Sequence, residues 1–256
     1  MVLDLFLPPR CPACGVPTGV VDPGIDELFC EGCAVSIEPC DGPVCTRCGV
    51  PLSSGTQDRL CGECLLNPLP TRGVKAPYLY GGAMAQAIRR LKHLSSAWVH
   101  RPLGRLLCRA APPSDTFECV VPVPIHRSML RRRGFNQAEL LGRTVAACGK
   151  RPLLADALIR KVQGADQRGL TRAERLAGVD GAFGANPRAT DRLEGARILL
   201  VDDVVTTGAT VAACTRELLR AGAKSVSVLA VARTPPPDWP GSERSPLPSA
   251  LESSEN

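Results

Sequence analysis

A short apolar run that ends in two adjacent carboxylates constrains this 256-residue chain more than any other feature. Residues 198–201 are Ile-Leu-Leu-Val, and Asp202 and Asp203 follow them directly. The run is short for a helix, and an unbroken apolar stretch bounded by charge is typical of a strand buried on both faces of a parallel sheet. Ligands of such sheets bind at the carboxyl ends of the strands. The run therefore predicts an α/β domain with a ligand site at the two aspartates.

A hydroxyl-rich turn follows the aspartates. It offers three hydroxyl groups, a glycine able to adopt a positive φ, and the free N–H groups of a helix that we predict over residues 209–221. Its residues are Thr206, Thr207, Gly208, Ala209 and Thr210. Such a turn binds a phosphate, whereas ionised carboxylates repel one unless a sugar with donor hydroxyls, or a metal, lies between them. A phosphorylated sugar is the predicted ligand; the alternative is an ordinary strand-turn-helix capped by Thr, in which a second carboxylate has no role.

The whole pattern, from the apolar run through Asp-Asp to Thr-Thr-Gly, resembles that of the type I phosphoribosyltransferases, which bind phosphoribosyl pyrophosphate (PRPP). The resemblance implies that Asp202 and Asp203 hold the ribose hydroxyls as the catalytic pair, and that the turn at 206–210 holds the 5′-phosphate. It also implies Mg²⁺, which binds together with PRPP. Because the charge of a departing pyrophosphate must be neutralised, Mg²⁺ and basic residues would act electrostatically.

Eight of the thirteen cysteines form four C-x2-C pairs near the amino terminus. Two such pairs can close one tetrahedral site of four thiolates, the geometry of structural Zn²⁺. The first site would use Cys11, Cys14, Cys30 and Cys33, and the second Cys45, Cys48, Cys61 and Cys64. Gly15 and Gly49 free the backbone for a tight knuckle in each site. We predict a double zinc ribbon over residues 1–70, with two structural zinc ions that have no open coordination position.

The cysteines also allow other interpretations. Disulfides would require an oxidising compartment, and the apolar start of the chain, interrupted by Asp4 and without a preceding basic residue, is not typical of a signal peptide. Interleaved pairing is a further alternative, and Cys40, between the two ribbons, could replace a ligand or be a free thiol.

No run of about 18 apolar residues exists, which argues against a membrane span. We expect a cytoplasmic protein.

Basic residues concentrate in the middle of the chain. The net charge is −6 over residues 1–70, +15 over 71–234 and −3 over 235–256. The densest cluster follows a strand predicted over 119–123 and comprises Arg127, Arg131, Arg132 and Arg133. Because arginine can donate two hydrogen bonds to one phosphate, we predict a loop that binds pyrophosphate or, with Phe135 as a stacking ring, nucleic acid. A solvated basic surface is the alternative.

The ribbons, the Pro-Val-Pro strand end at 122–124, the Arg-Gly-Phe-Asn-Gln run at 133–137 and the Asp-Asp site resemble, in this order, the ComF family of competence proteins. The resemblance implies a type I phosphoribosyltransferase-like domain over 71–233 and a role in DNA uptake during natural transformation, with single-stranded DNA and a helicase-type motor as partners. Two hypotheses follow. One is a PRPP-dependent transferase; the other is an accessory protein that binds single-stranded DNA and uses the PRPP pocket for regulation without catalysis.

Further elements are predicted around these sites. We expect strands over 74–80 and 224–232, and helices over 83–94, 98–110 and 136–148. The ComF resemblance places a mobile loop at 158–183, in which Lys161 matches the family pattern and would contact pyrophosphate or nucleic acid. Residues 68–73 mark the domain boundary through their Pro and Gly content, and residues 234–256 are expected to form a disordered tail.

Overall fold

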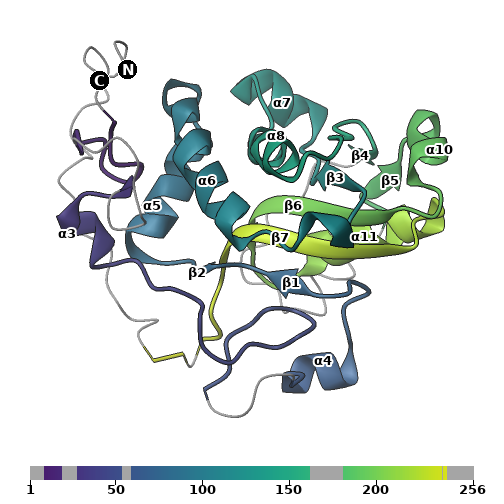
Figure 1. The fold of residues 1–256 in the computed structure, drawn as a ribbon, viewed down its shortest axis with the longest axis horizontal. Helices are drawn as coiled ribbons and strands as arrows, with labels where there is room; N and C mark the ends of the chain where they lie inside the picture. Colours follow the sequence, from purple (N-terminus) through teal and green to yellow (C-terminus); the bar gives the residue numbers. More distant parts are fainter. Residues whose placement is uncertain (1–8, 19–27, 54–58, 162–180, 238, 241–256) are drawn as a thin grey trace.

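A five-stranded parallel sheet forms the centre of the molecule (Figure 1). The computed structural model describes residues 9–18, 28–53, 59–161, 181–237 and 239–240. The strands of the sheet are β1 Val74–Lys75, β2 Tyr78–Leu79, β3 Cys119–Pro122, β6 Arg197–Val205 and β7 Ser225–Arg233. Their order is β1-β7-β6-β3, and β2 pairs with β7 further along the edge that β1 occupies. The predicted parallel α/β sheet is confirmed.

The side chains of the central strand alternate between two apolar layers. Leu199 and Val201 pack in a layer that includes the helices α5 Gly82–Leu91, α6 His100–Ala110 and α8 Gln137–Gly149. Ile198 and Leu200 pack in the opposite layer, which includes the helix α11 Ala209–Arg220. All four side chains are at most 1% exposed. The apolar run is therefore buried on both faces, as its sequence predicts.

The amino-terminal segment forms two ribbons that pack against different layers. The first contains the isolated bridge Arg10–Pro17 and the short helix α3 Glu31–Ala34, and its cysteines pack in the layer of α5. The second contains the bridge Val44–Pro51 and the helix α4 Gly62–Leu66, and its cysteines pack in the layer of α11. Figure 1 shows α3 near α5, and α4 below β1. Each ribbon is thus joined to its own side of the core.

Several elements differ in their limits from those predicted. The strand expected over 74–80 is divided into β1 and β2, because Pro77 between them has no N–H for a ladder. The helix expected over 83–94 ends at Leu91. The remaining short helices are η1 Leu94–Val99, η2 Ser114–Thr116, η3 Pro187–Ala189 and α10 Thr190–Leu193. Among the described helices, none combines the length and the apolar character that a membrane crossing requires.

The prediction of a loop at the arginine cluster is wrong, because these residues form the helix α7 Arg127–Arg133. The His126 side chain accepts a hydrogen bond from the N–H of Ser128 at the start of this helix. Gly134 ends it with φ 80°, a left-handed conformation that suits glycine. The caps at both ends thus favour a helix at this basic stretch, and the arginines are spread around the helix axis.

An antiparallel hairpin lies beside the sheet. Its strands are β4 Leu158–Arg160 and β5 Phe183–Ala185. Most of the loop predicted over 158–183 falls at 162–180, outside the described residues, and so does most of the predicted tail, at 241–256.

A disulfide joins the two longest helices of the first layer, between Cys108 of α6 and Cys148 of α8. It lies outside both ribbons, and neither cysteine belongs to a C-x2-C pair. Its partners are 40 residues apart in sequence, so spacing alone could not indicate the pair.

Candidate functional site

The acidic pair lies toward the carboxyl end of β6. Asp202 and Asp203 are 8% and 6% exposed. Each Oδ1 atom accepts a hydrogen bond from the next backbone N–H, at 2.9 Å from Asp203 and 3.0 Å from Val204. Burial and the adjacent charge of Asp203 raise the pKa of Asp202 well above its ordinary value. Burial and the neighbouring carboxylate therefore disfavour the ionised form of Asp202.

Lys92 supplies a countercharge for Asp203. It follows the last residue of α5, and its Nζ atom lies 3.2 Å from Asp203 Oδ2. The ammonium is close enough for an ion pair but is not aligned for a hydrogen bond, and Oδ2 is buried without a donor among the described residues. A sugar hydroxyl can donate to such an oxygen, and hydrated Mg²⁺ can also bind there. The residues present thus fit a ribose and Mg²⁺.

The turn after β6 has the features of an anion site. Gly208 adopts φ 86° and caps α11. Thr206 is exposed, and Thr207 and Thr210 are partly exposed, so their hydroxyls can reach a ligand. The N–H groups in the first turn of a helix have no acceptor within the helix and attract negative charge. Thr207 Oγ1 already accepts a hydrogen bond from the N–H of Ala209 at 3.4 Å, so the turn at 206–210 offers a ligand its other hydroxyls and N–H groups.

A basic pocket of about 400 Å³ lies beside the acidic pair. It is lined by Arg89, Lys92, His93, Leu94, Arg132 and Arg133. Lys92 connects this pocket with Asp203 through the ion pair. Burial lowers the pKa of Arg133, and the charge of Asp203 opposes that shift. A space lined by several cationic side chains suits a polyphosphate group.

The structure divides the basic residues predicted for this function. Arg132 and Arg133 line the pocket, whereas Arg127 and Arg131 lie on α7 outside it. Lys161 lies beside Gly184 of the β4–β5 hairpin and does not line the pocket either. Its predicted contact with pyrophosphate or nucleic acid stays a prediction.

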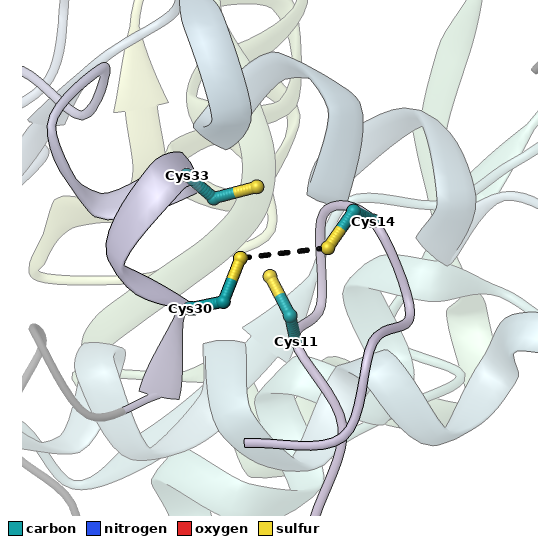
Figure 2. Close-up of side chains that lie close together, drawn as sticks. All are labelled: Cys11, Cys14, Cys30 and Cys33. Atoms are coloured by element: carbon teal, nitrogen blue, oxygen red, sulfur yellow. Dashed lines mark hydrogen bonds between the residues drawn. The ribbon is translucent and has the colours of Figure 1, made fainter. Parts of the chain in front are cut away.

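The eight ribbon cysteines meet in the two groups that their spacing predicts. Figure 2 shows the Sγ atoms of the first group turned toward one another. Within each group, all four Sγ atoms lie within 4.8 Å of one another. Tetrahedral zinc with bonds of about 2.3 Å requires sulfurs about 3.8 Å apart. The separations of 3.6 Å between Cys14 and Cys30 and between Cys48 and Cys61 are close to this value. Both four-cysteine groups therefore fit structural zinc, and interleaved pairing is excluded for these cysteines.

The knuckle backbones explain how the sequence forms these groups. In the first ribbon the N–H of Gly15 donates to Cys11 O at 2.8 Å, and in the second the N–H of Gly49 donates to Cys45 O at the same distance. Both glycines have a positive φ, 83° and 67°, as predicted. Cys40 is a free, partly buried thiol outside both groups.

Comparisons with known proteins match two domain families and several whole proteins to this chain. A double zinc ribbon domain matches residues 2–65, and a phosphoribosyl transferase domain matches residues 143–238. Competence protein F of Haemophilus influenzae is 29% identical over 211 residues, covering 80% of this chain and 90% of the relative. The DNA utilization protein YhgH of Escherichia coli is 30% identical over 237 residues, covering 90% of this chain and 99% of the relative. The chain belongs to the ComF family. Competence protein ComFC of Bacillus subtilis is 27% identical, covering 82% of this chain and 85% of the relative.

Three basic residues of the site of this ComF protein were missed in the sequence. Arg89, Lys92 and His93 come from a segment that the sequence describes only as an apolar helix. Their basic side chains follow one another near the end of that helix, which is a usable but weak signal. Lys92 is about 110 positions from Asp203, so only the folded chain brings the two charges together.

Proposed function

We propose that this ComF protein binds PRPP with Mg²⁺ between β6, α5 and α7, and that it serves DNA uptake. One observation carries the binding proposal: Asp203 Oδ2 is buried, ion-paired and without a hydrogen-bond donor among the described residues. The ion pair with Lys92 offsets part of the cost of burying this carboxylate, but it leaves Oδ2 without a hydrogen bond. A ligand hydroxyl can supply that hydrogen bond, and ribose has such hydroxyls.

Each part of PRPP would meet a complementary group. The turn at 206–210 would hold the 5′-phosphate, Asp202 and Asp203 the ribose hydroxyls, and the pocket cations the pyrophosphate. Mg²⁺, bound with PRPP, neutralises part of the pyrophosphate charge. Lys92, Arg132 and Arg133, which line the pocket, stabilise further negative charge as pyrophosphate departs. The proposal is therefore a phosphoribosyltransferase that acts mainly through positioned charge.

Titration calorimetry with PRPP and Mg²⁺ tests the binding site. Asp203→Asn removes the charge but keeps the shape, and we expect its affinity to fall by one to two orders of magnitude, since a hydrogen bond to a charged group contributes about 1.5–3 kcal/mol. Glu118→Gln is the matched control, because Glu118 is an exposed acid beside the opposite end of the sheet, paired with Arg197. Equal affinity in wild type and Asp203→Asn would refute the site.

The second candidate function is a DNA-uptake accessory without catalysis. It is favoured by the position of Arg127 and Arg131 outside the pocket, and by the names of the relatives, a competence protein and a DNA utilization protein. On this proposal the protein acts beside a helicase-type motor, and the arginines of α7 outside the pocket contact the phosphates of single-stranded DNA.

Two measurements separate the candidates. Release of pyrophosphate from PRPP on addition of candidate acceptors supports the transferase. Salt-sensitive binding of a single-stranded oligonucleotide supports the accessory function, provided that Arg127→Ala combined with Arg131→Ala weakens it while PRPP binding is retained. An oligonucleotide affinity unchanged by that double substitution would contradict the assignment of DNA to α7.

A further inference from the structure

Arg233 connects the second ribbon with the phosphate turn. It is the last residue of β7 and is only 3% exposed. Its Nε donates to Cys48 O at 2.9 Å, and its Nη1 donates to Val205 O at 3.0 Å and to Thr206 O. One side chain thus binds the backbone of a zinc-ligating cysteine and the backbone from which the turn begins.

A buried guanidinium in this place needs an explanation, because the burial of a charge is costly unless its donors are hydrogen-bonded. Arginine meets the need with a planar fork, whose several N–H groups point in fixed directions. At Arg233 one edge of the fork faces the knuckle, and another faces the carbonyls of Val205 and Thr206. Lysine has the charge but a single donor centre, so it cannot span both sides.

A second contact of the same ribbon reaches the turn independently. Leu69, just after the second cysteine group in sequence, packs so closely on Gly208 that a Cβ atom at Gly208 would lie 2.9 Å from Leu69 Cδ1. Thr71 is fully buried, and its carbonyl accepts a hydrogen bond from the Arg47 side chain. The segment predicted as a domain boundary is therefore packed against the site.

We propose that Arg233 is a positioning residue, which uses the second zinc knuckle as an anchor to hold the phosphate turn in its binding conformation. The expected effect on binding of the 5′-phosphate rests on the proposed function. The expected rigidity of residues 206–210 rests on the structure alone. The first ribbon offers a matched contrast. Arg90 of α5 also contacts a knuckle, through a hydrogen bond of 3.3 Å from Nη1 to Ala13 O.

The test compares Arg233→Lys with Arg90→Lys in the full-length, zinc-loaded protein. Amide hydrogen exchange of residues 206–210 is measured without ligand, PRPP affinity is measured with Mg²⁺, and zinc content is measured for both variants. We expect Arg233→Lys to speed exchange in the turn and to weaken PRPP binding, each by about tenfold or more, with about two zinc ions retained. Arg90→Lys, which alters the contact between α5 and the first knuckle, should leave exchange in the turn at 206–210 within about twofold of wild type.

Each outcome decides a separate statement. Wild-type exchange in Arg233→Lys would overturn the inference, and so would an equal acceleration in Arg90→Lys, which indicates general loosening. If wild type itself fails to bind PRPP, the proposed function fails, while the exchange data still decide the role of Arg233. Cys45→Ser adds a test of the anchor: it should lose one zinc and speed exchange in the turn, with little further effect in an Arg233→Lys background. Loss of that zinc without a change in the turn would refute the anchor.

Discussion

Replacement of Gly208 by alanine tests the contact between the second ribbon and the phosphate turn. Gly208 has φ 86°, and a Cβ atom there would lie 2.9 Å from Leu69 Cδ1 and 3.5 Å from Leu69 Cδ2. The leucine cannot move aside freely, because it is itself only 3% exposed. Gly208→Ala should therefore destabilise the protein in two ways, through the backbone and through packing.

The two contributions can be given magnitudes. A left-handed conformation costs a residue with a Cβ atom about 1–2 kcal/mol. Overpacking of a buried site typically costs about 1–3 kcal/mol. We expect Gly208→Ala to lower the free energy of unfolding by roughly 2–5 kcal/mol, and to weaken PRPP binding because the turn must shift.

Urea unfolding of the zinc-loaded protein measures the effect, and Gly195→Ala is the matched control. Gly195 has a similar φ of 67°, but a Cβ atom there would meet nothing within 4 Å. Its replacement should cost only the backbone contribution, about 1–2 kcal/mol. In a Leu69→Ala background the packing contribution of Gly208→Ala should disappear. The contact would be refuted if Gly208→Ala lowered the free energy of unfolding by no more than Gly195→Ala does, and if this decrease were the same in the Leu69→Ala background.

Two further predictions concern protonation and oxidation. The raised pKa of Asp202 means that the folded protein binds a proton that the unfolded chain has lost, so its stability falls as pH rises. Asp202→Asn should therefore unfold at higher urea concentration than wild type, with a larger difference at about pH 8 than at about pH 5.5; a constant difference would contradict this. Reduction of the Cys108–Cys148 disulfide should lower the free energy of unfolding by about 2–4 kcal/mol, whereas a variant with both cysteines replaced by serine should not respond to the reductant.

The features that could be predicted from the sequence are those set by neighbouring residues. A C-x2-C pair with a following glycine forms a knuckle through its own backbone, so both cysteine groups were predictable. The apolar run at 198–201 is buried on both faces for the same local reason. The arginine cluster shows the limit of such reasoning, since its composition suggested a phosphate loop while the caps at His126 and Gly134 produce a helix.

Lys92 and Arg233 could not be predicted, because their partners are distant in sequence. Yet Arg233, together with the helix α5 that precedes Lys92, connects the ribbons with the candidate site. Helix α5 contacts the first knuckle through Arg90 and is followed by Lys92, which pairs with Asp203. Strand β7 ends in Arg233, which binds the second knuckle and the carbonyls that precede the turn. The ribose half and the phosphate half of the proposed site are thus each connected to one ribbon by a basic side chain. A ribbon that served only as a separate docking module would need neither connection, so the zinc ribbons are better understood as supports that hold a charged site in place.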